Sequence, residues 1–118
     1  MIEFVYKKKT RGYICNNEVR IARRKNKSKS NAQIYEIIFY NYSWKKAFGD
    51  SEYGIVGKEN NRIYFSKANK NFGYKLYQPT SQGDSVRCLK ITDLDNKLMA
   101  VDGNLIFDEE EDLYYIEK

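Results

Sequence analysis

Short segments in which apolar and polar residues alternate recur along most of this chain. Residues 19–23, VRIAR, place apolar side chains at every second position, which is the period of a half-buried strand. Residues 34–42 are rich in Ile, Tyr and Phe, which also favour strands. The sequence predicts strands over residues 2–9, 13–15, 19–23, 34–42, 53–56, 62–65, 73–77, 85–91, 105–107 and 113–116. Residues 59–61, Glu-Asn-Asn, are expected to turn one hairpin.

Two segments carry helix signals instead. Ser43 suits an N-cap and Gly49 suits the position after a helix, so residues 43–49 predict a helix of about two turns. Residues 92–95, TDLD, have the form of a capping box with Asp in the last place. An apolar stripe then runs to Gly103 and favours a second helix. The alternative is a strand over residues 97–101 followed by a tight turn at Asp102-Gly103.

The order of these elements repeats with an offset of 51 residues. Residues 35–38 then fall on 86–89, residues 55–56 on 106–107, and residues 63–65 on 114–116. A unit of this size cannot bury its apolar face alone and needs a partner copy. The alternative is chance similarity between strand-rich segments. We therefore expect one domain, 1–118, with an N-terminal strand extension (1–17), a first repeat (18–67) and a second repeat (70–118).

The segments GYKLYQ, SVRCLKI, TDLDNKLMAVDG and LIFDEEEDLYYI, which lie between Gly73 and Ile116, resemble the AbrB/MazE-like swapped-hairpin family. Residues 20–67 resemble it more weakly. Residues 84–87, DSVR, lack the family's Gly-Arg, and its strand-ending proline is missing. The resemblance implies an α+β, mostly β fold. Two strand-strand-short helix-hairpin units would pack as a pseudo-twofold swapped-hairpin barrel that binds DNA as a transcription regulator.

Composition narrows the function. The 118 residues are 42% hydrophobic, enough for one core, and contain no histidine. Without histidine there is no Ser-His or Cys-His pair and no His-containing zinc site. Cys15 and Cys88 are expected to be buried thiols, with a disulfide as the alternative. The chain has no apolar run of about 20 residues and no signal-peptide pattern at its start. We expect a cytoplasmic protein that is not an enzyme, does not enter membranes, and uses no metal or cofactor.

Charge is unevenly placed along the chain. Residues 1–92 hold 19 Lys/Arg and 7 Asp/Glu, whereas residues 93–118 hold 2 and 9. Such asymmetry indicates a face that binds polyanions, or pairing between opposite ends. Strand and loop cations can follow phosphates, and arginine can also read guanine edges. The expected nucleic-acid-binding residues are Lys7, Lys8, Lys9, Arg11, Arg20, Arg23, Arg24, Lys25, Lys27 and Lys29, with a solvated loop as the alternative.

The acidic run is the second candidate surface. It consists of Asp108, Glu109, Glu110, Glu111 and Asp112. It could bind a protein, mimic a phosphate backbone or hold a hard cation, although its spacing is not that of an EF-hand. The alternative is a solvated hairpin turn. Trp44 is expected to anchor the short helix rather than to contact a ligand.

Two functions follow from these patterns. The first is a non-enzymatic nucleic-acid-binding protein, resembling a transcription regulator, that uses the basic strand and loop to bind DNA or RNA. The second is an inhibitor that binds a nucleic-acid-binding host protein, such as a phage-encoded antagonist of a nuclease or of a CRISPR effector complex. The working unit is either a monomer with internal pseudo-twofold symmetry or a homodimer.

Overall fold

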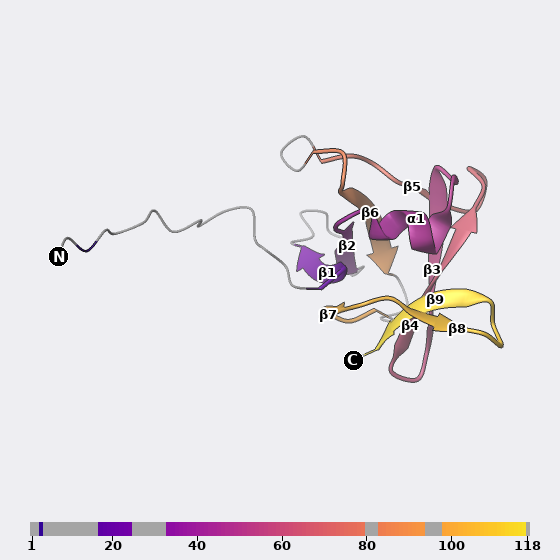
Figure 1. Cartoon of the computed structure of the whole chain (residues 1–118). Coiled ribbons are helices and arrows are strands. Elements are labelled where there is room, and N and C mark those ends of the chain that lie inside the picture. Colours follow the sequence, from indigo (N-terminus) through magenta and orange to yellow (C-terminus); the bar gives the residue numbers. More distant parts are fainter. Residues whose placement is uncertain (1–2, 4–16, 25–32, 80–82, 94–97, 118) are drawn as a thin grey trace.

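The computed structural model describes residues 3, 17–24, 33–79, 83–93 and 98–117, which form two antiparallel sheets and one short helix (Figure 1). Sheet A has the strand order β6 (Arg87–Asp93), β2 (Gln33–Phe39), β1 (Val19–Arg24), β7 (Val101–Gly103). Sheet B has the order β5 (Tyr74–Lys75), β3 (Tyr53–Glu59), β4 (Arg62–Ala68), β9 (Leu113–Glu117), β8 (Ile106–Asp108). The helix α1 (Ser43–Phe48) connects β2 to β3. The expected mostly β fold is confirmed.

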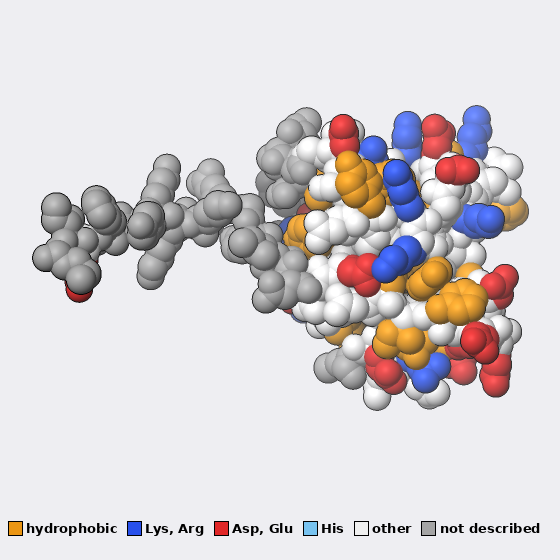
Figure 2. Space-filling view, in the orientation of Figure 1, with side chains coloured by type: hydrophobic (Ala, Val, Ile, Leu, Met, Phe, Trp, Pro, Cys, Tyr) orange, Lys and Arg blue, Asp and Glu red, His pale blue; other side chains and the backbone are white. Residues whose placement is uncertain are grey.

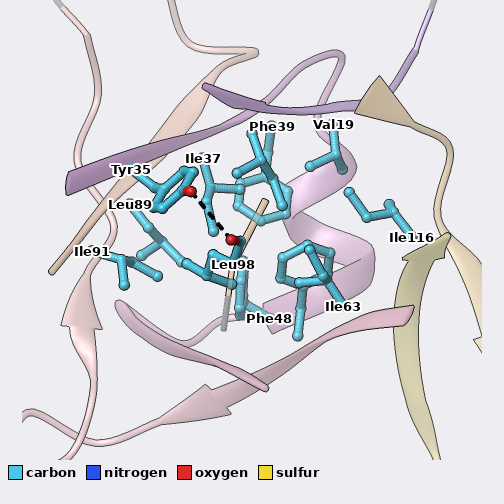
Figure 3. Close-up of a cluster of buried hydrophobic side chains, with 12 residues drawn as sticks. Val19, Tyr35, Ile37, Phe39, Phe48, Ile63, Leu89, Ile91, Leu98 and Ile116 are labelled. Carbon is cyan, nitrogen blue, oxygen red and sulfur yellow. Dashed lines mark hydrogen bonds between the residues drawn. The ribbon is translucent and has the colours of Figure 1, made fainter. Parts of the chain in front are cut away.

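One cluster of buried side chains joins both sheets and α1 (Figure 3). Alternate residues of β1, β2, β4 and β6 enter it, as the period of two requires. At its centre the rings of Phe39, Phe48 and Phe65 meet edge to face, with Phe39 5.0 Å from Phe48 and 5.1 Å from Phe65 between centroids. All three rings are fully buried. Phe48 therefore fixes α1 against the strands on either side of the core.

Local signals in the sequence located most elements correctly. The hairpin β3–β4 turns at Asn60-Asn61, where Asn60 has a φ of 56°, a left-handed conformation that Asn tolerates better than most residues. The hairpin β8–β9 encloses the acidic run as expected. The helix α1 ends at Phe48 and is followed by Gly49 at its C-cap, in line with the expected glycine stop. Its N-cap, however, is Tyr42 rather than Ser43, whose Oγ donates a hydrogen bond of 3.0 Å to Glu18 O.

The predicted second helix is wrong for the described residues. Thr92 belongs to β6, residues 98–100 have no regular structure, and residues 101–103 form β7. The alternative turn is also wrong, because Asp102 lies within β7 opposite Arg20. The main-chain N–H of Leu98 donates to Asp93 Oδ2 (2.7 Å), and its carbonyl accepts from the Tyr35 hydroxyl (3.2 Å). The local bond to Asp93 and the long-range bond from Tyr35 hold Leu98 in the core, and together they outweigh local helix propensity.

Equivalent strands of the two expected repeats are neighbours in the sheets. The strand β2 pairs with β6, and β4 pairs with β9. Within the second pair, Tyr64 lies opposite Tyr115 and Ile63 opposite Ile116. The strands expected over residues 2–9 and 13–15 fall outside the described residues except for Glu3, which has no regular structure. Most of the connection between β6 and β7 is also outside them.

Candidate nucleic-acid interface

The predicted basic site is described only along β1, where its arginines meet carboxylates. Arg20 Nε donates to Asp102 Oδ1 at 3.1 Å, and Arg24 Nη2 donates to Glu36 Oε1 at 2.7 Å. Arg23 is exposed and forms no ion pair with another described residue. The remaining predicted cations, Lys7, Lys8, Lys9, Arg11, Lys25, Lys27 and Lys29, lie outside the described residues. Among the residues that the structure describes, Arg23 is thus the one arginine of β1 without a carboxylate partner.

Glu36 is held ionised beside Arg24. Burial opposes its ionisation, but hydrogen bonds from the Tyr77 hydroxyl (2.6 Å) and from Arg24 outweigh burial and lower the pKa of Glu36. Burial and the hydrogen bond to Glu36 in turn raise the pKa of Tyr77. Burial and the Glu36 charge also raise the pKa of the neighbouring Cys88 thiol to about 12. These groups consequently form a structural network on the outer side of sheet A, with little capacity left to bind phosphate.

The excess positive charge of the chain lies outside the described residues. The described residues carry 12 Lys/Arg and 15 Asp/Glu, a net charge of −3. Because the whole chain has a net charge of +5, the remaining residues have a net charge of +8. On the face drawn in Figure 2, Lys and Arg side chains stand among acidic and hydrophobic ones. A broad basic face is therefore not present on this part of the surface, and any phosphate contact there must be local.

The acidic run is divided by the structure into one inward carboxylate and four exposed ones. Asp108 Oδ2 accepts from the Tyr64 hydroxyl at 2.8 Å, and its Oδ1 accepts from the N–H groups of Glu110 and Glu111. The Tyr64 bond and these turn bonds lower the pKa of Asp108. Glu109, Glu110, Glu111 and Asp112 are exposed in the hairpin turn. Asp108 thus stabilises the turn that presents the other carboxylates.

A second group of residues, which we call the aromatic–cationic cluster, lies at the start of α1. It consists of Tyr42, Trp44, Lys45 and Arg87. Arg87 Cζ lies 4.6 Å from the centre of the Trp44 ring, and Lys45 Nζ lies 5.4 Å from it. Lys45 Nζ is also 4.8 Å from the Tyr42 ring. At these distances an aromatic face attracts a cation electrostatically. The cluster therefore holds two positive charges beside two rings.

The backbone holds this cluster in an unusual conformation. Asn41 and Tyr42 have φ angles of 51° and 59°, which are left-handed and uncommon for residues other than glycine. The N–H of Tyr42 and the indole Nε1 of Trp44 both donate to Ser85 O, at 2.8 and 3.2 Å. In this conformation 47% of the Tyr42 surface is exposed. Left-handed backbone held by such bonds is often found where a side chain serves a function.

Arg87 is fixed from the other side, on β6. Its Nη1 donates to the carbonyl oxygens of Asp84 and Val86, at 2.9 and 2.8 Å. Arg87 pairs with Phe39 at the end of β2, only a few residues before Trp44. The pairing of β2 with β6 therefore brings the arginine to the helix. Sequence reasoning assigned Trp44 to anchoring α1 and missed Tyr42 and Arg87; the lone tryptophan among cations was the available signal.

A pocket of about 360 Å³ opens next to the cluster. Its volume is at the lower end of the range of about 300–1,000 Å³ found for small-ligand sites. Its lining includes three cations, two carboxylates and the indole: Lys45, Lys75, Arg87, Asp50, Glu52 and Trp44. A main-chain hydrogen bond of 2.8 Å from Leu76 N to Glu52 O joins the two segments that form its wall. The pocket thus offers donors, acceptors and an aromatic surface together.

The described part of the chain contains no group of three or more His, Cys, Asp or Glu side chains placed to hold a metal ion. None of its helices is long and apolar enough to cross a membrane. Comparison with protein-family models, with curated proteins and with solved structures gave no match to this chain.

Proposed function

We propose that this chain is a non-enzymatic nucleic-acid-binding protein and that the aromatic–cationic cluster is its described binding surface. The observation that carries the proposal is the Trp44 ring, flanked by Arg87 and Lys45 beside the exposed Tyr42. Every nucleic-acid base can stack on an aromatic ring, whatever the sequence. Cations near the ring neutralise the phosphates that adjoin the stacked bases. Trp44 thereby gains a binding role in addition to its contact with Ser85.

The cations outside the described residues belong to the same proposal. Residues 7–11 and 25–29 contain most of the excess positive charge. Clustered Lys and Arg attract nucleic acid without reading its sequence. They would raise the local concentration of the strand, while the aromatic–cationic cluster holds the bases. A cytoplasmic location fits this role, and the free buried thiol of Cys88 is in keeping with it.

We also propose that the two repeats form a pseudo-twofold barrel similar to that of swapped-hairpin transcription regulators, here within one chain. The offset of 51 makes Tyr64 equivalent to Tyr115, and these residues lie opposite each other in β4 and β9. The strands β2 and β6 pair in the same antiparallel manner. A twofold axis through both strand pairs would relate the two units. A homodimer is the alternative working unit, and sedimentation of the purified chain distinguishes the two.

Trp44 is the only tryptophan of the chain, so its fluorescence reports directly on the site. We expect single-stranded oligonucleotides to quench this fluorescence. The logarithm of the binding constant should fall with the logarithm of the salt concentration with a slope of about −2 or steeper, because three cations near the site each contribute about 0.7 on single strands. Lys45→Glu should weaken binding about fivefold or more, since a carboxylate beside phosphates costs on the order of 1 kcal/mol.

Lys58→Glu is the matched control for this measurement. Lys58 is exposed on β3, about 17 Å along the strand from its first residue, and the substitution makes the same change of charge. The affinity of the Lys58→Glu variant for the oligonucleotide should stay within about twofold of that of the unmodified chain at 0.15 M salt, because charges that far apart are screened. Equal affinities for the two variants, or no quenching by any oligonucleotide at low salt, would refute the proposal.

The second function, a protein-binding inhibitor, is favoured by the hairpin β8–β9. Ile106 and Phe107 are each 44% exposed on the edge strand β8, next to the four exposed carboxylates of the turn. An apolar edge beside acidic side chains suits a basic protein surface. The test is inhibition of purified nucleases by the chain. Inhibition that survives Glu110→Lys combined with Glu111→Lys would exclude this hairpin as the inhibitory surface.

A further inference from the structure

The pocket beside Trp44 combines features that a phosphate site alone does not need. Lys45, Lys75 and Arg87 supply positive charge, but Asp50 and Glu52 also line the pocket. Both carboxylates are exposed, and neither makes a hydrogen bond or ion pair with any other described residue. Carboxylates only accept hydrogen bonds when ionised, and they repel phosphates. A base that contacts these carboxylates directly must therefore present hydrogen-bond donors to them.

Among the bases, guanine provides these donors in the most suitable pattern. The pairing edge of guanine carries two adjacent donors, the ring N1–H and the exocyclic amino group, which one carboxylate can accept together. The pairing edges of adenine, cytosine and uracil each place a single donor next to an acceptor, which a carboxylate oxygen would repel. Paired donors and acceptors of this kind underlie base discrimination in proteins. A carboxylate that contacts a base edge therefore favours guanine over the other bases.

The same contact requires that the guanine be unpaired. In a duplex the pairing edge is occupied by cytosine, whereas in single strands, loops and flipped nucleotides it is available to protein side chains. A pocket of about 360 Å³ is small enough to take one base. Lys45 and Lys75 are exposed at the pocket, and Arg87 is held over the indole by its bonds to the main chain. These cations line the same pocket and can pair with the phosphates that adjoin the base.

We propose that this pocket binds one unpaired guanine of a single-stranded nucleic acid beside the Trp44 ring, with Asp50 and Glu52 accepting hydrogen bonds from its pairing edge. This inference rests on the proposed nucleic-acid-binding function, and it adds a base preference to that function. Ribose and deoxyribose strands share the chemistry, so a matched DNA and RNA pair of probes distinguishes them.

The test uses Trp44 fluorescence with thymidine oligonucleotides of about eight nucleotides, a length within the usual range for one binding site. One central position is thymine, guanine, adenine or cytosine, and the RNA probes are the uridine equivalents. We expect the guanine strand to bind about tenfold tighter than the all-thymine strand, as a good bidentate contact provides. The adenine and cytosine strands should resemble the all-thymine strand.

The combined variant Asp50→Asn with Glu52→Gln keeps the shape of both side chains but removes the charge of each. Because this change raises affinity for every strand, the ratio of guanine to thymine affinity is the quantity to compare. The ratio should fall to about one. The matched control is Glu59→Gln, an exposed carboxylate at the far end of β3, and the ratio should be unchanged there. Circular dichroism checks that each variant is folded.

The outcomes separate this inference from the proposed function. Equal binding of all four strands, or a guanine preference that persists in the combined variant, overturns the guanine pocket while nucleic-acid binding stands. Failure of every strand to quench Trp44 removes both. Tighter binding of a duplex that contains the same guanine would also overturn the pocket, because a paired guanine cannot present its pairing edge.

Discussion

We expect Gly54 in β3 to be intolerant of substitution, because its Cα faces the Phe48 ring that fixes α1. A Cβ added at Gly54 would lie 2.8 Å from Phe48 Cδ1 and closer still to Cε1. Phe48 is fully buried and packed edge to face against Phe39, so it cannot swing away without disturbing the core. We expect Gly54→Ala to lower the free energy of unfolding by about 1–3 kcal/mol, the usual cost of overpacking.

Gly57, three residues further along β3, is the matched control. A Cβ added there meets nothing within 4 Å. Alanine loses less conformational freedom on folding than glycine does, so Gly57→Ala should raise the free energy of unfolding by about 0.5–1 kcal/mol. The two identical substitutions on one strand should therefore have opposite signs. Only their different surroundings can account for such a result.

Urea unfolding followed by circular dichroism measures both changes. With an m-value of about 1–3 kcal/mol/M for a small domain, a cost of about 2 kcal/mol lowers the Gly54→Ala midpoint by about 1 M. Truncation of the opposing ring in Phe48→Leu should make Gly54→Ala less costly, which a double-mutant cycle reports as a favourable coupling. A neutral Gly54→Ala, or an additive cycle, would refute the packing described for α1.

Three further predictions test the network on sheet A and the strained turn. Tyr42→Gly removes a left-handed non-glycine residue and should raise the free energy of unfolding by about 0.5–1 kcal/mol, while weakening oligonucleotide binding; a variant that binds normally contradicts the assignment of Tyr42 to the interface. The lowered pKa of Glu36 contributes stability above about pH 4.5 that is lost as the pH falls through the folded-state pKa. In Glu36→Gln the melting temperature should accordingly fall less steeply as the pH is lowered below that value. A pH dependence equal to that of the unmodified chain would argue against the network. Burial raises the pKa of Cys88 to about 12, so iodoacetamide at pH 8 should leave the Cys88 peptide unmodified until urea is added; rapid native modification would contradict its burial.

Residues close together in the chain determined the elements that were predicted correctly. The alternation in β1 and β2, the Asn60-Asn61 turn and Gly49 after α1 each act within a few residues. Backbone sterics and the period of a strand are sufficient to read them. The antiparallel hairpins followed from the same signals. The error at the predicted second helix arose where Leu98 is held by Tyr35, which lies 63 residues away.

The basic site shows a second limit of sequence reasoning. A run of cations around β1 was visible, but its partners were not. Asp102 is 82 residues from Arg20, and it faces this arginine only because β7 pairs with β1. An opposite charge within hydrogen-bond distance changes a cation from a phosphate ligand into half of an ion pair. Which cations remain available therefore depended on strand order rather than on composition.

The sequence by itself determined that the chain forms a mostly β fold with a short helix after residue 42 and an acidic hairpin near its C-terminal end. Only the tertiary structure decided which residues meet at the candidate site. Arg87 reaches Trp44 because β6 pairs with β2 and Arg87 stands opposite Phe39, and Lys75 joins them because β5 pairs with β3. Local patterns specify secondary structure through short-range sterics and burial, whereas a site assembled from three separate segments exists only when the sheets have chosen their order and register.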